Sequence, residues 1–227
     1  MHRFNIGGTY NVFEASKQND VRRIIFASSG GTMLGYEMEN PYTEIVGADY
    51  DKIPETWTMI TDDMPFMPIH LGYFLQVFGE ALRRMYSDQF GVSVLNIRLG
   101  PVLTGDVPVL HRYYPGYLSH ADCVQLVQKR IDAPDDLMFD TLDAMSDNNY
   151  RWRDICHTKA AIGFVPTGSA EDHAIEDKGG IHQVSETPTP PGKHAPNQQL
   201  VRYAGHGVRS RLNSCGIELS YLYVPRI

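Results

Sequence analysis

The sequence predicts an α/β fold: a doubly wound, mostly parallel sheet with helices on both faces. Three mainly apolar segments have the length of buried strands, at residues 22–28, 92–98 and 137–142, and the first of them is rich in β-branched residues. Segments with helical periodicity alternate with them, at residues 3–19, 71–90, 122–131 and 152–162. Strands and helices that alternate in this way favour parallel pairing through right-handed crossovers.

The 227 residues are enough for one domain with an appended tail. Hydrophobic residues make up 42% of the chain and charged residues 21%, which is ordinary for a globular protein. The formal net charge of −7 argues against a nucleic-acid partner, because phosphate contacts require clustered basic charge. No apolar run approaches the ~20 residues of a membrane span, and no signal peptide precedes the first polar segment. We therefore expect a cytoplasmic protein that binds neither nucleic acid nor membranes.

The first predicted strand follows a helix over residues 3–19 and leaves the sheet through Ser28, Ser29 and two glycines. In open α/β sheets, ligands bind at the carboxyl ends of the strands. The two serines therefore stand where hydroxyl groups could meet a substrate oxygen, and the alternative is that they only end a strand. Residues 30–68 contain four prolines and predict a long loop, which in a compact domain is usually a functional rim.

The clearest helix in the sequence covers residues 71–90, where apolar side chains recur every three or four positions over about five turns. Gly91 ends it, and the second strand follows at once, so helix and strand are joined by a tight glycine turn. Gly100, Pro101 and Val102 then leave the sheet beside the serine loop.

Residues 103–118 are irregular and aromatic, and Ser119 is the expected N-cap of the next helix, with Asp122 completing a reciprocal cap. A short helix over residues 152–162 is expected to end at a glycine that is soon followed by a proline.

The helix and strand pattern is lost after about residue 172. Residues 187–196 are Pro-rich, residues 198–211 are polar and basic, and only residues 217–224 could pair as a strand. We therefore divide the chain into a domain at 1–172 and an irregular tail at 173–227, which we expect to be disordered or loosely packed.

Six short motifs follow one another along the chain. They are NIGGTYNVFEA at 5–15, IFASS at 25–29, FGEAL at 78–82, IRLG at 97–100, YLSHAD at 117–122, and YRWRD at 150–154 with GFVP at 163–166. Together they resemble the extended short-chain dehydrogenase/reductases, also called the NAD-dependent epimerase/dehydratase family, and most of all its uronate-dehydrogenase-like branch. The resemblance implies a partial Rossmann-like domain that lacks the first βαβ units.

The resemblance also implies NAD or NADP as cofactor and a sugar or sugar acid as substrate. Ser29 matches the family's hydroxyl that bonds the reacting oxygen, and Arg112 stands where the uronate branch places a cation for the sugar carboxylate, a task that suits a guanidinium. The alternative for Arg112 is a solvated loop arginine. Ser119 is the second expected substrate contact. The expected cofactor contacts are Asn5, Ala27, Ser28, Gly100, Pro101 and Val102. No metal ligand set is evident, and His111 and His120 fit structural or surface roles.

Two departures from the family limit what the resemblance implies. The Gly-rich turn that binds the dinucleotide belongs before residue 5, and we expect this chain to lack it. The family's acid/base Tyr and Lys fall at Gly72 and Gln76, while Tyr73 is displaced by one residue, about 100° around the helix. The Lys matters because a phenol titrates near pH ~10 and a nearby cation lowers its pKa, which neutral Gln76 cannot do.

Two functions follow as hypotheses. The first is an NAD(P)-dependent oxidoreductase or epimerase that acts on a sugar or sugar acid, with Ser29, Tyr73 and Gln76 at the catalytic positions. The second is a truncated, non-catalytic pseudoenzyme or interaction remnant of the same fold. In that case an unpaired sheet edge would favour association, so a homo-oligomer is also an expectation.

Overall fold

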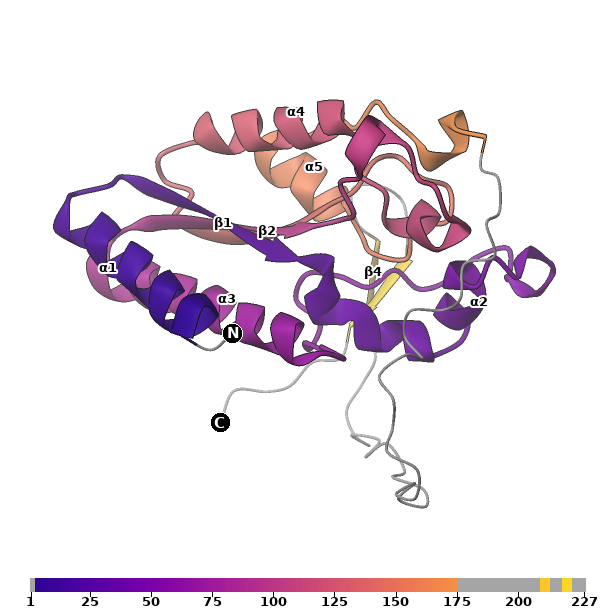
Figure 1. Cartoon of the computed structure of the whole chain (residues 1–227), viewed down its shortest axis with the longest axis horizontal. Helices are drawn as coiled ribbons and strands as arrows, with labels where there is room; N and C mark the ends of the chain where they lie inside the picture. The colour runs from indigo at the N-terminus through magenta and orange to yellow at the C-terminus, as the bar shows by residue number, and fades with distance from the viewer. Residues whose placement is uncertain (1–2, 175–208, 213–217, 222–227) are drawn as a thin grey trace, which may run out of the picture.

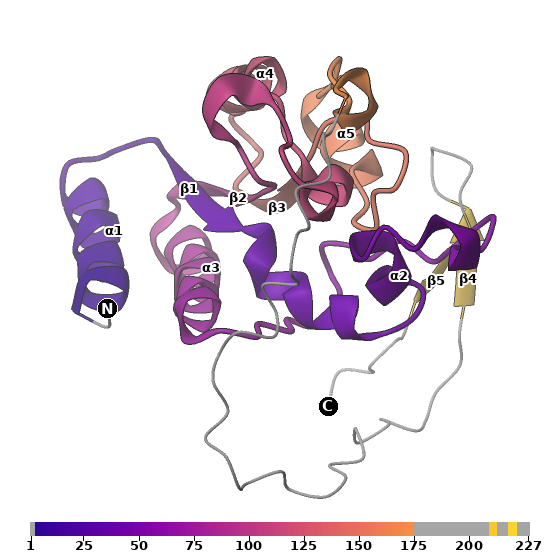
Figure 2. The ribbon, with the colours of Figure 1, turned by 45° about the vertical axis from the view of Figure 1, so that its right-hand side comes forward.

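The computed structural model describes residues 3–174 and, for the backbone alone, two short strands at 209–212 and 218–221. The central sheet has three parallel strands in the order β1-β2-β3, namely β1 (Arg23–Ser29), β2 (Ser93–Leu99) and β3 (Phe139–Ala144). Helices α1 (Thr9–Gln18) and α3 (Leu71–Phe90) cover one face, and α4 (His120–Ile131) and α5 (Cys156–Ile162) cover the other (Figure 1, Figure 2). The predicted α/β architecture with a parallel sheet is confirmed.

The three strands end side by side. Ser29 lies opposite Leu99, and Leu99 lies opposite Ala144. The carboxyl ends of the three strands therefore lie at one edge of the sheet, beside the loops that follow the strands. The third strand begins two residues later than predicted, because the N–H of Leu137 bonds the carbonyl of Pro134 within a turn at 3.1 Å.

The predicted long helix matches α3 in both bounds, and Gly91 caps it in the left-handed region with φ 65°. Most residues avoid this conformation, so the glycine is required there. The first predicted helix is present as a π-helical segment, η1 (Arg3–Gly8), that continues into α1.

Helix α5 begins four residues later than predicted. Residues before it are extended, since Ile60 pairs with Arg153 in an isolated parallel bridge. The N–H of Ile60 donates to the carbonyl of Trp152 at 2.8 Å, and the N–H of Asp154 donates back to the carbonyl of Ile60 at 2.8 Å. These bonds hold Trp152 and Arg153 beside the sheet rather than in the helix.

Each face of the sheet has its own apolar core. On the α4/α5 face the buried members are Leu95, Ile97, Leu118, Leu126, Ala133, Leu142, Ala144, Ile162 and Phe164. On the α1/α3 face they are Phe13, Ile24, Leu82, Tyr86, Val92 and Val94. The strands of a doubly covered sheet are buried on both sides, and in β2 this holds for every residue from Ser93 to Arg98, the polar Asn96 and Arg98 included.

The prediction of a long loop over residues 30–68 is wrong in part. The segment contains three short helices: η2 (Gly30–Met38) and η3 (Tyr50–Lys52), both 3-10, and α2 (Tyr42–Val46) between them. A third apolar cluster explains them, with buried members Met33, Tyr42, Ile45, Val46, Ile60 and Trp152. Residues 103–118 likewise contain two short 3-10 turns, η4 (Thr104–Asp106) and η5 (His111–Gly116).

Ser119 caps α4 as predicted, since its Oγ accepts the N–H of Asp122 at 3.1 Å. The prediction that the Asp122 side chain bonds back to the N-cap residue is wrong. The Asp122 carboxylate instead accepts the hydroxyl of Ser146 at 2.5 Å and the N–H groups of Thr167 and Gly168 at 2.8 and 3.1 Å. It thereby ties α4 to the chain that follows α5.

Two strands lie in the tail, β4 (Arg209–Leu212) and β5 (Glu218–Tyr221), and they pair antiparallel. β5 falls within the predicted strand at 217–224. The expectation that no other segment of the tail pairs as a strand is wrong, because β4 is the partner of β5. The expectation of disorder in the rest of the tail lies outside the described residues. In the part of the chain that the structure describes, none of the helices has the length and apolar character to span a bilayer.

Candidate functional site

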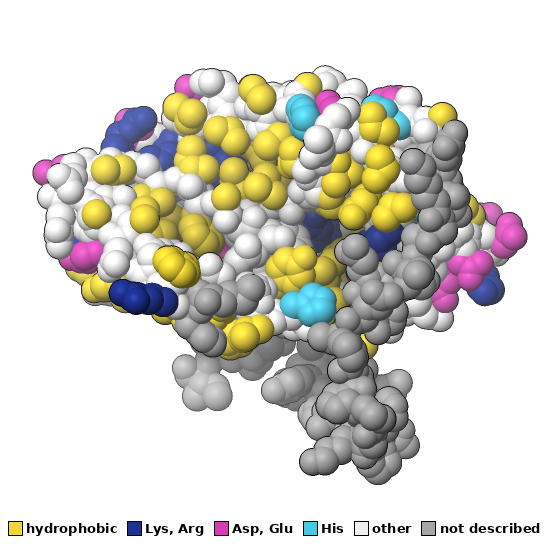
Figure 3. Space-filling model, viewed as in Figure 1, with side chains coloured by type: hydrophobic (Ala, Val, Ile, Leu, Met, Phe, Trp, Pro, Cys, Tyr) yellow, Lys and Arg dark blue, Asp and Glu magenta, His cyan; other side chains and the backbone are white. Residues whose placement is uncertain are grey.

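A cavity of about 360 Å³ lies at the carboxyl ends of β1 and β2. Five residues predicted for the site line it, namely Ser29, Tyr73, Gly100, Pro101 and Arg112. Lining residues that had no predicted role include Gly31, Glu37, His70, Trp152 and Arg153. In Figure 3, Lys and Arg side chains are recessed among hydrophobic ones over the region where β1 ends in Figure 1.

The two serines at the end of β1 have different environments, because successive side chains of a strand point to opposite faces. Ser28 is 4% exposed, and its hydroxyl donates to Oε1 of Glu80 at 2.5 Å. Ser29 reaches the cavity, where its Oγ accepts the N–H of Gly31 at 3.0 Å. The Ser29 hydroxyl proton remains available to a ligand, whereas the Ser28 hydroxyl is committed to the interior.

Tyr73 lines the cavity although it is displaced by one residue from the family position. Its ring packs on Gly31 so closely that a Cβ on this glycine would overlap it. The ring centroid of His70, the residue that precedes α3, lies 5.9 Å from that of Tyr73. Gln76 lies almost one turn further along α3, outside the cavity lining, and its buried Oε1 has no hydrogen-bond partner.

Arg112 is paired with a buried carboxylate. Its Nη2 forms an ion pair with Oε2 of Glu37, whose side chain is 3% exposed, while that of Arg112 is 22% exposed. Burial raises the pKa of Glu37, and the charges of Arg112 and Arg153 act in the opposite direction without cancelling the effect of burial. Arg112 is therefore not the solvated loop arginine of the alternative interpretation.

Arg153 belongs to a buried chain of alternating charges. Its guanidinium covers Gly30, where a Cβ would overlap it, and its Nη1 donates to Oδ1 of Asp143. Asp143 also lies 3.9 Å from Nη1 of Arg98, whose Nη2 donates to Glu80 at 3.0 Å. Burial raises the pKa of Asp143 and the two guanidinium groups oppose this effect. The network fixes the position of Arg153 at the cavity wall.

The remaining predicted residues lie outside the cavity lining: Asn5, Ala27, Ser28, Gln76, Val102 and Ser119. Asn5 is half-buried in η1, Ala27 is exposed on β1, and Val102 is 43% exposed. Ser119 is buried as the N-cap of α4, so its hydroxyl is used by the helix. Gly100 is required by packing, because a Cβ there would overlap the carbonyl oxygen of Gly116.

The sequence analysis missed Glu37 and Arg153. Arg153 lies in the YRWRD motif, which carried the resemblance but had no role assigned. Glu37 lay within a segment predicted as a loop, and no pattern in the sequence connects it with Arg112, which is 75 positions away.

The described residues fit the nicotinamide end of a dinucleotide. Pro101 lines the cavity, and the exposed Val102 extends an apolar surface from it. Residues 3–174 contain no Gly-x-Gly-x-x-Gly turn that could cradle a pyrophosphate.

Comparisons with known proteins identify several relatives. The chain is 32% identical over 178 residues to L-arabinose 1-dehydrogenase (NAD(P)(+)) of Haloferax volcanii, covering 73% of this chain and 66% of that protein. It is 32% identical over 201 residues to uronate dehydrogenase of Agrobacterium fabrum, covering 88% of this chain and 64% of the relative. The chain thus spans slightly less than two thirds of the length of these relatives. No family model matches the chain.

Solved structures of uronate dehydrogenases are also similar to this chain. A mutant of uronate dehydrogenase from Agrobacterium tumefaciens complexed with NAD superimposes with a TM-score of 0.61 at 32% identity, over 74% of this chain and 55% of that one. The parallel sheet and the helices on its two faces are therefore Rossmann-like.

Proposed function

Because the chain belongs to the NAD-dependent epimerase/dehydratase family, the extended short-chain dehydrogenase/reductases, we propose that its cavity binds a sugar acid beside the nicotinamide of NAD or NADP. The observation that carries the proposal is the placement of Ser29 and Arg112 in one cavity at the carboxyl ends of β1 and β2. A hydroxyl donor and a guanidinium on one cavity wall suit a ligand that has both a reacting oxygen and a carboxylate.

Each residue then has a defined task. Arg112 binds the sugar carboxylate through donors that Glu37 leaves free, since a guanidinium has five N–H groups. The Ser29 hydroxyl donates a hydrogen bond to the reacting oxygen and polarises the bond between that oxygen and carbon. Pro101 and Val102 contact the nicotinamide ring. A bound nicotinamide cofactor supplies the hydride acceptor or donor.

Two phenols line the cavity, those of Tyr73 and Tyr113. Tyr73 is the candidate acid/base, because it lies on α3 one residue from the position at which the resemblance places the family's Tyr. In oxidation of a carbinol the phenolate of this side chain accepts the hydroxyl proton of the substrate and becomes the phenol, and in reduction the phenol returns that proton to the oxygen. Gln76 supplies no positive charge to stabilise the phenolate. The proposed enzyme is therefore a slow oxidoreductase.

A second candidate function is a non-catalytic binder of the same ligands. It is favoured by the residues at the two positions where the resemblance implies the family's acid/base pair, Gly72 and Gln76, of which the first has no side chain and the second no charge. Such a pseudoenzyme keeps the cavity and loses proton transfer.

Two measurements on the full chain separate these functions. NADH binding is followed by fluorescence, and turnover is followed as NADH formation from NAD or NADP with glucuronate or galacturonate. Micromolar NADH binding with measurable turnover supports the oxidoreductase, while binding without turnover supports the binder. The absence of both NADH and sugar-acid binding at millimolar concentration would contradict both functions.

Arg112→Gln tests the carboxylate contact, and Arg151→Gln is the matched control. The two arginine side chains are similarly exposed, 22% and 20%, and each is paired with an acidic residue, but Arg151 does not line the cavity. We expect Arg112→Gln to weaken glucuronate binding at least tenfold while Arg151→Gln leaves it unchanged. Equal effects of the two variants would remove Arg112 from the site.

A further inference from the structure

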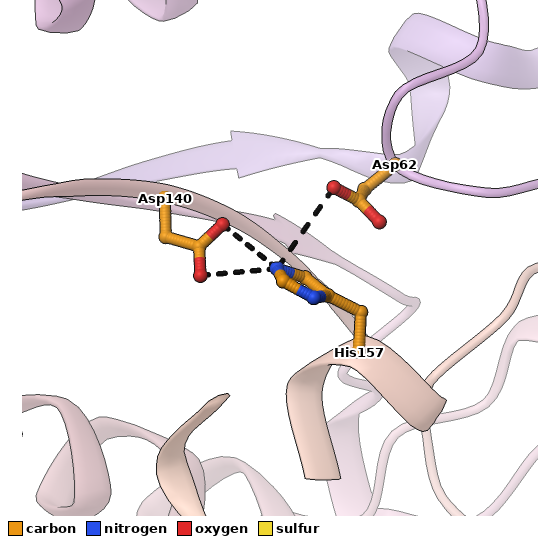
Figure 4. A group of neighbouring side chains, drawn as sticks. All are labelled: Asp62, Asp140 and His157. Carbon is orange, nitrogen blue, oxygen red and sulfur yellow. Dashed lines mark hydrogen bonds and ion pairs between the residues drawn. The ribbon is translucent and has the colours of Figure 1, made fainter. Parts of the chain in front are cut away.

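We propose that Asp62, Asp140 and His157 form a binding site for one divalent transition-metal ion such as Zn²⁺, separate from the cavity. The three side chains converge from different parts of the chain: the segment that precedes α3, strand β3 and helix α5 (Figure 4). One ligand atom from each lies within 4.8 Å of the others.

The distances between the ligand atoms suit a shared ion. Nε2 of His157 lies 2.8 and 3.0 Å from the two carboxylate oxygens of Asp140. Zinc binds imidazole nitrogen and carboxylate oxygen at about 2.0–2.2 Å, which places neighbouring ligand atoms roughly 3 Å apart. Oδ2 of Asp62 lies 4.0 Å from the same nitrogen, so it has to approach by about 1 Å in a bound state.

The neighbouring cation does not occupy these carboxylates. Arg83 on α3 is close enough for its charge to interact with Asp62 and Asp140. Its Nε and Nη1 nevertheless have no hydrogen-bond partner, so this guanidinium is not engaged through them. Arg83 therefore adds a nearby charge without a hydrogen bond from Nε or Nη1, and a divalent ion would take the place of the proton in the hydrogen bond between His157 and Asp140.

The donor set selects the kind of ion. An imidazole with two carboxylates suits zinc and related transition metals, while Mg²⁺ and Ca²⁺ prefer sites made of oxygen atoms alone. The side chains of His157 and Asp62 are 43% and 25% exposed, so an ion can enter and water can complete its coordination. Three protein ligands with an open position are the arrangement that zinc has in many catalytic sites.

Isothermal titration of the chelator-treated full chain with ZnCl₂ tests the proposal. We expect one ion to bind with micromolar affinity and a tenfold excess of Mg²⁺ or Ca²⁺ not to displace it. The chain has nine histidines, so the location of the ion needs a variant. Asp62→Asn is the informative change. The ion pair of Asp62 with His157 is long, at 4.0 Å, so the substitution leaves the close contact between Asp140 and His157 in place.

We expect Asp62→Asn and His157→Gln each to weaken zinc binding at least tenfold. His120→Gln is the matched control, an exposed histidine outside the cluster whose Nε2 lies 2.9 Å from the carbonyl oxygen of Leu103. Unfolding curves without metal show whether a variant is folded. Zinc binding that is absent, or that survives both cluster variants, or that Ca²⁺ abolishes, would overturn the proposal.

Discussion

Replacing Glu37 by Gln should strengthen the binding of a sugar acid in the cavity. Glu37 is buried and pairs with Arg112, the side chain that we assign to the ligand carboxylate. A bound carboxylate and Glu37 thus share one guanidinium and repel each other. The substitution removes this repulsion and keeps the size of the side chain.

The magnitude follows from the geometry of two carboxylates on one guanidinium. At a separation of roughly 6 Å and an effective dielectric constant of about 20, their repulsion is about 3 kcal/mol. Arg112 is 22% exposed, so solvent screens part of the interaction. We therefore expect a gain of about 1.4 kcal/mol, which is a tenfold lower dissociation constant.

The affinity for glucuronate is measured by titration calorimetry at several pH values, with glucose as the uncharged ligand. Because burial raises the pKa of Glu37, the carboxyl group gains a proton as the pH falls toward that pKa, and binding by the natural protein should become stronger. The variant should show no such rise, and glucose binding should be unchanged.

Glu39→Gln is the matched control, since it removes the same charge from an exposed position two residues away, outside the cavity lining. We expect it to leave the affinity within twofold of the natural protein. Weaker glucuronate binding by Glu37→Gln, or an equal gain in both variants, would refute the placement of the sugar carboxylate on Arg112.

Three further predictions concern the support of the site. Asp143→Asn should cost about 3–5 kcal/mol of unfolding free energy, because it leaves the buried guanidinium of Arg153 without its anion, while Arg98 keeps its ion pair with Glu80. The control Asp147→Asn, in an exposed ion pair, should cost under ~1 kcal/mol, and thermal unfolding compares the two variants. Ser28→Ala should lower the unfolding free energy in urea by about 1.5–3 kcal/mol and leave the NADH affinity unchanged, because the Ser28 hydroxyl donates to a buried carboxylate. A variant that keeps its stability and loses NADH binding would show that Ser28 contacts the cofactor. Gly100→Ala should lower the unfolding free energy in urea by about 2–3 kcal/mol, because the new Cβ would overlap the carbonyl oxygen of Gly116, and shifting the backbone costs energy. An unchanged urea midpoint would contradict this packing.

The parts of the fold that the sequence predicted are those with local signals. Helix α3 shows a regular apolar repeat and a closing glycine, and β1 and β2 are short, mainly apolar segments, so their bounds came within a residue of the structure. Residues 30–68 lack such a repeat. Their short helices are stabilised by packing of Met33 and Ile45 with Trp152, more than 100 positions away, and no local pattern reports that contact.

The site divides in the same way. Ser29, Tyr73 and Arg112 could be placed from the family motifs and the order of the strands. Ser28 was expected to contact the cofactor on the basis of the family resemblance, but strand alternation turns its side chain toward Glu80. The pairing of Arg112 with Glu37 depends on how η2 folds against the loop after β2, and residue order alone does not determine it.

Charge balance in the cavity determines which ligands it can select. The two guanidinium groups at its wall, Arg112 and Arg153, are matched by two buried carboxylates, Glu37 and Asp143. The empty cavity therefore presents little net charge, and a general excess of positive potential cannot be what attracts a sugar acid. Selectivity has to come from geometry, through the donors of Arg112 that Glu37 leaves free, and from the protonation of Glu37. A cavity of this kind should discriminate strongly among anions by shape, so glucuronate should bind and a small anion such as acetate should not compete with it at equal concentration.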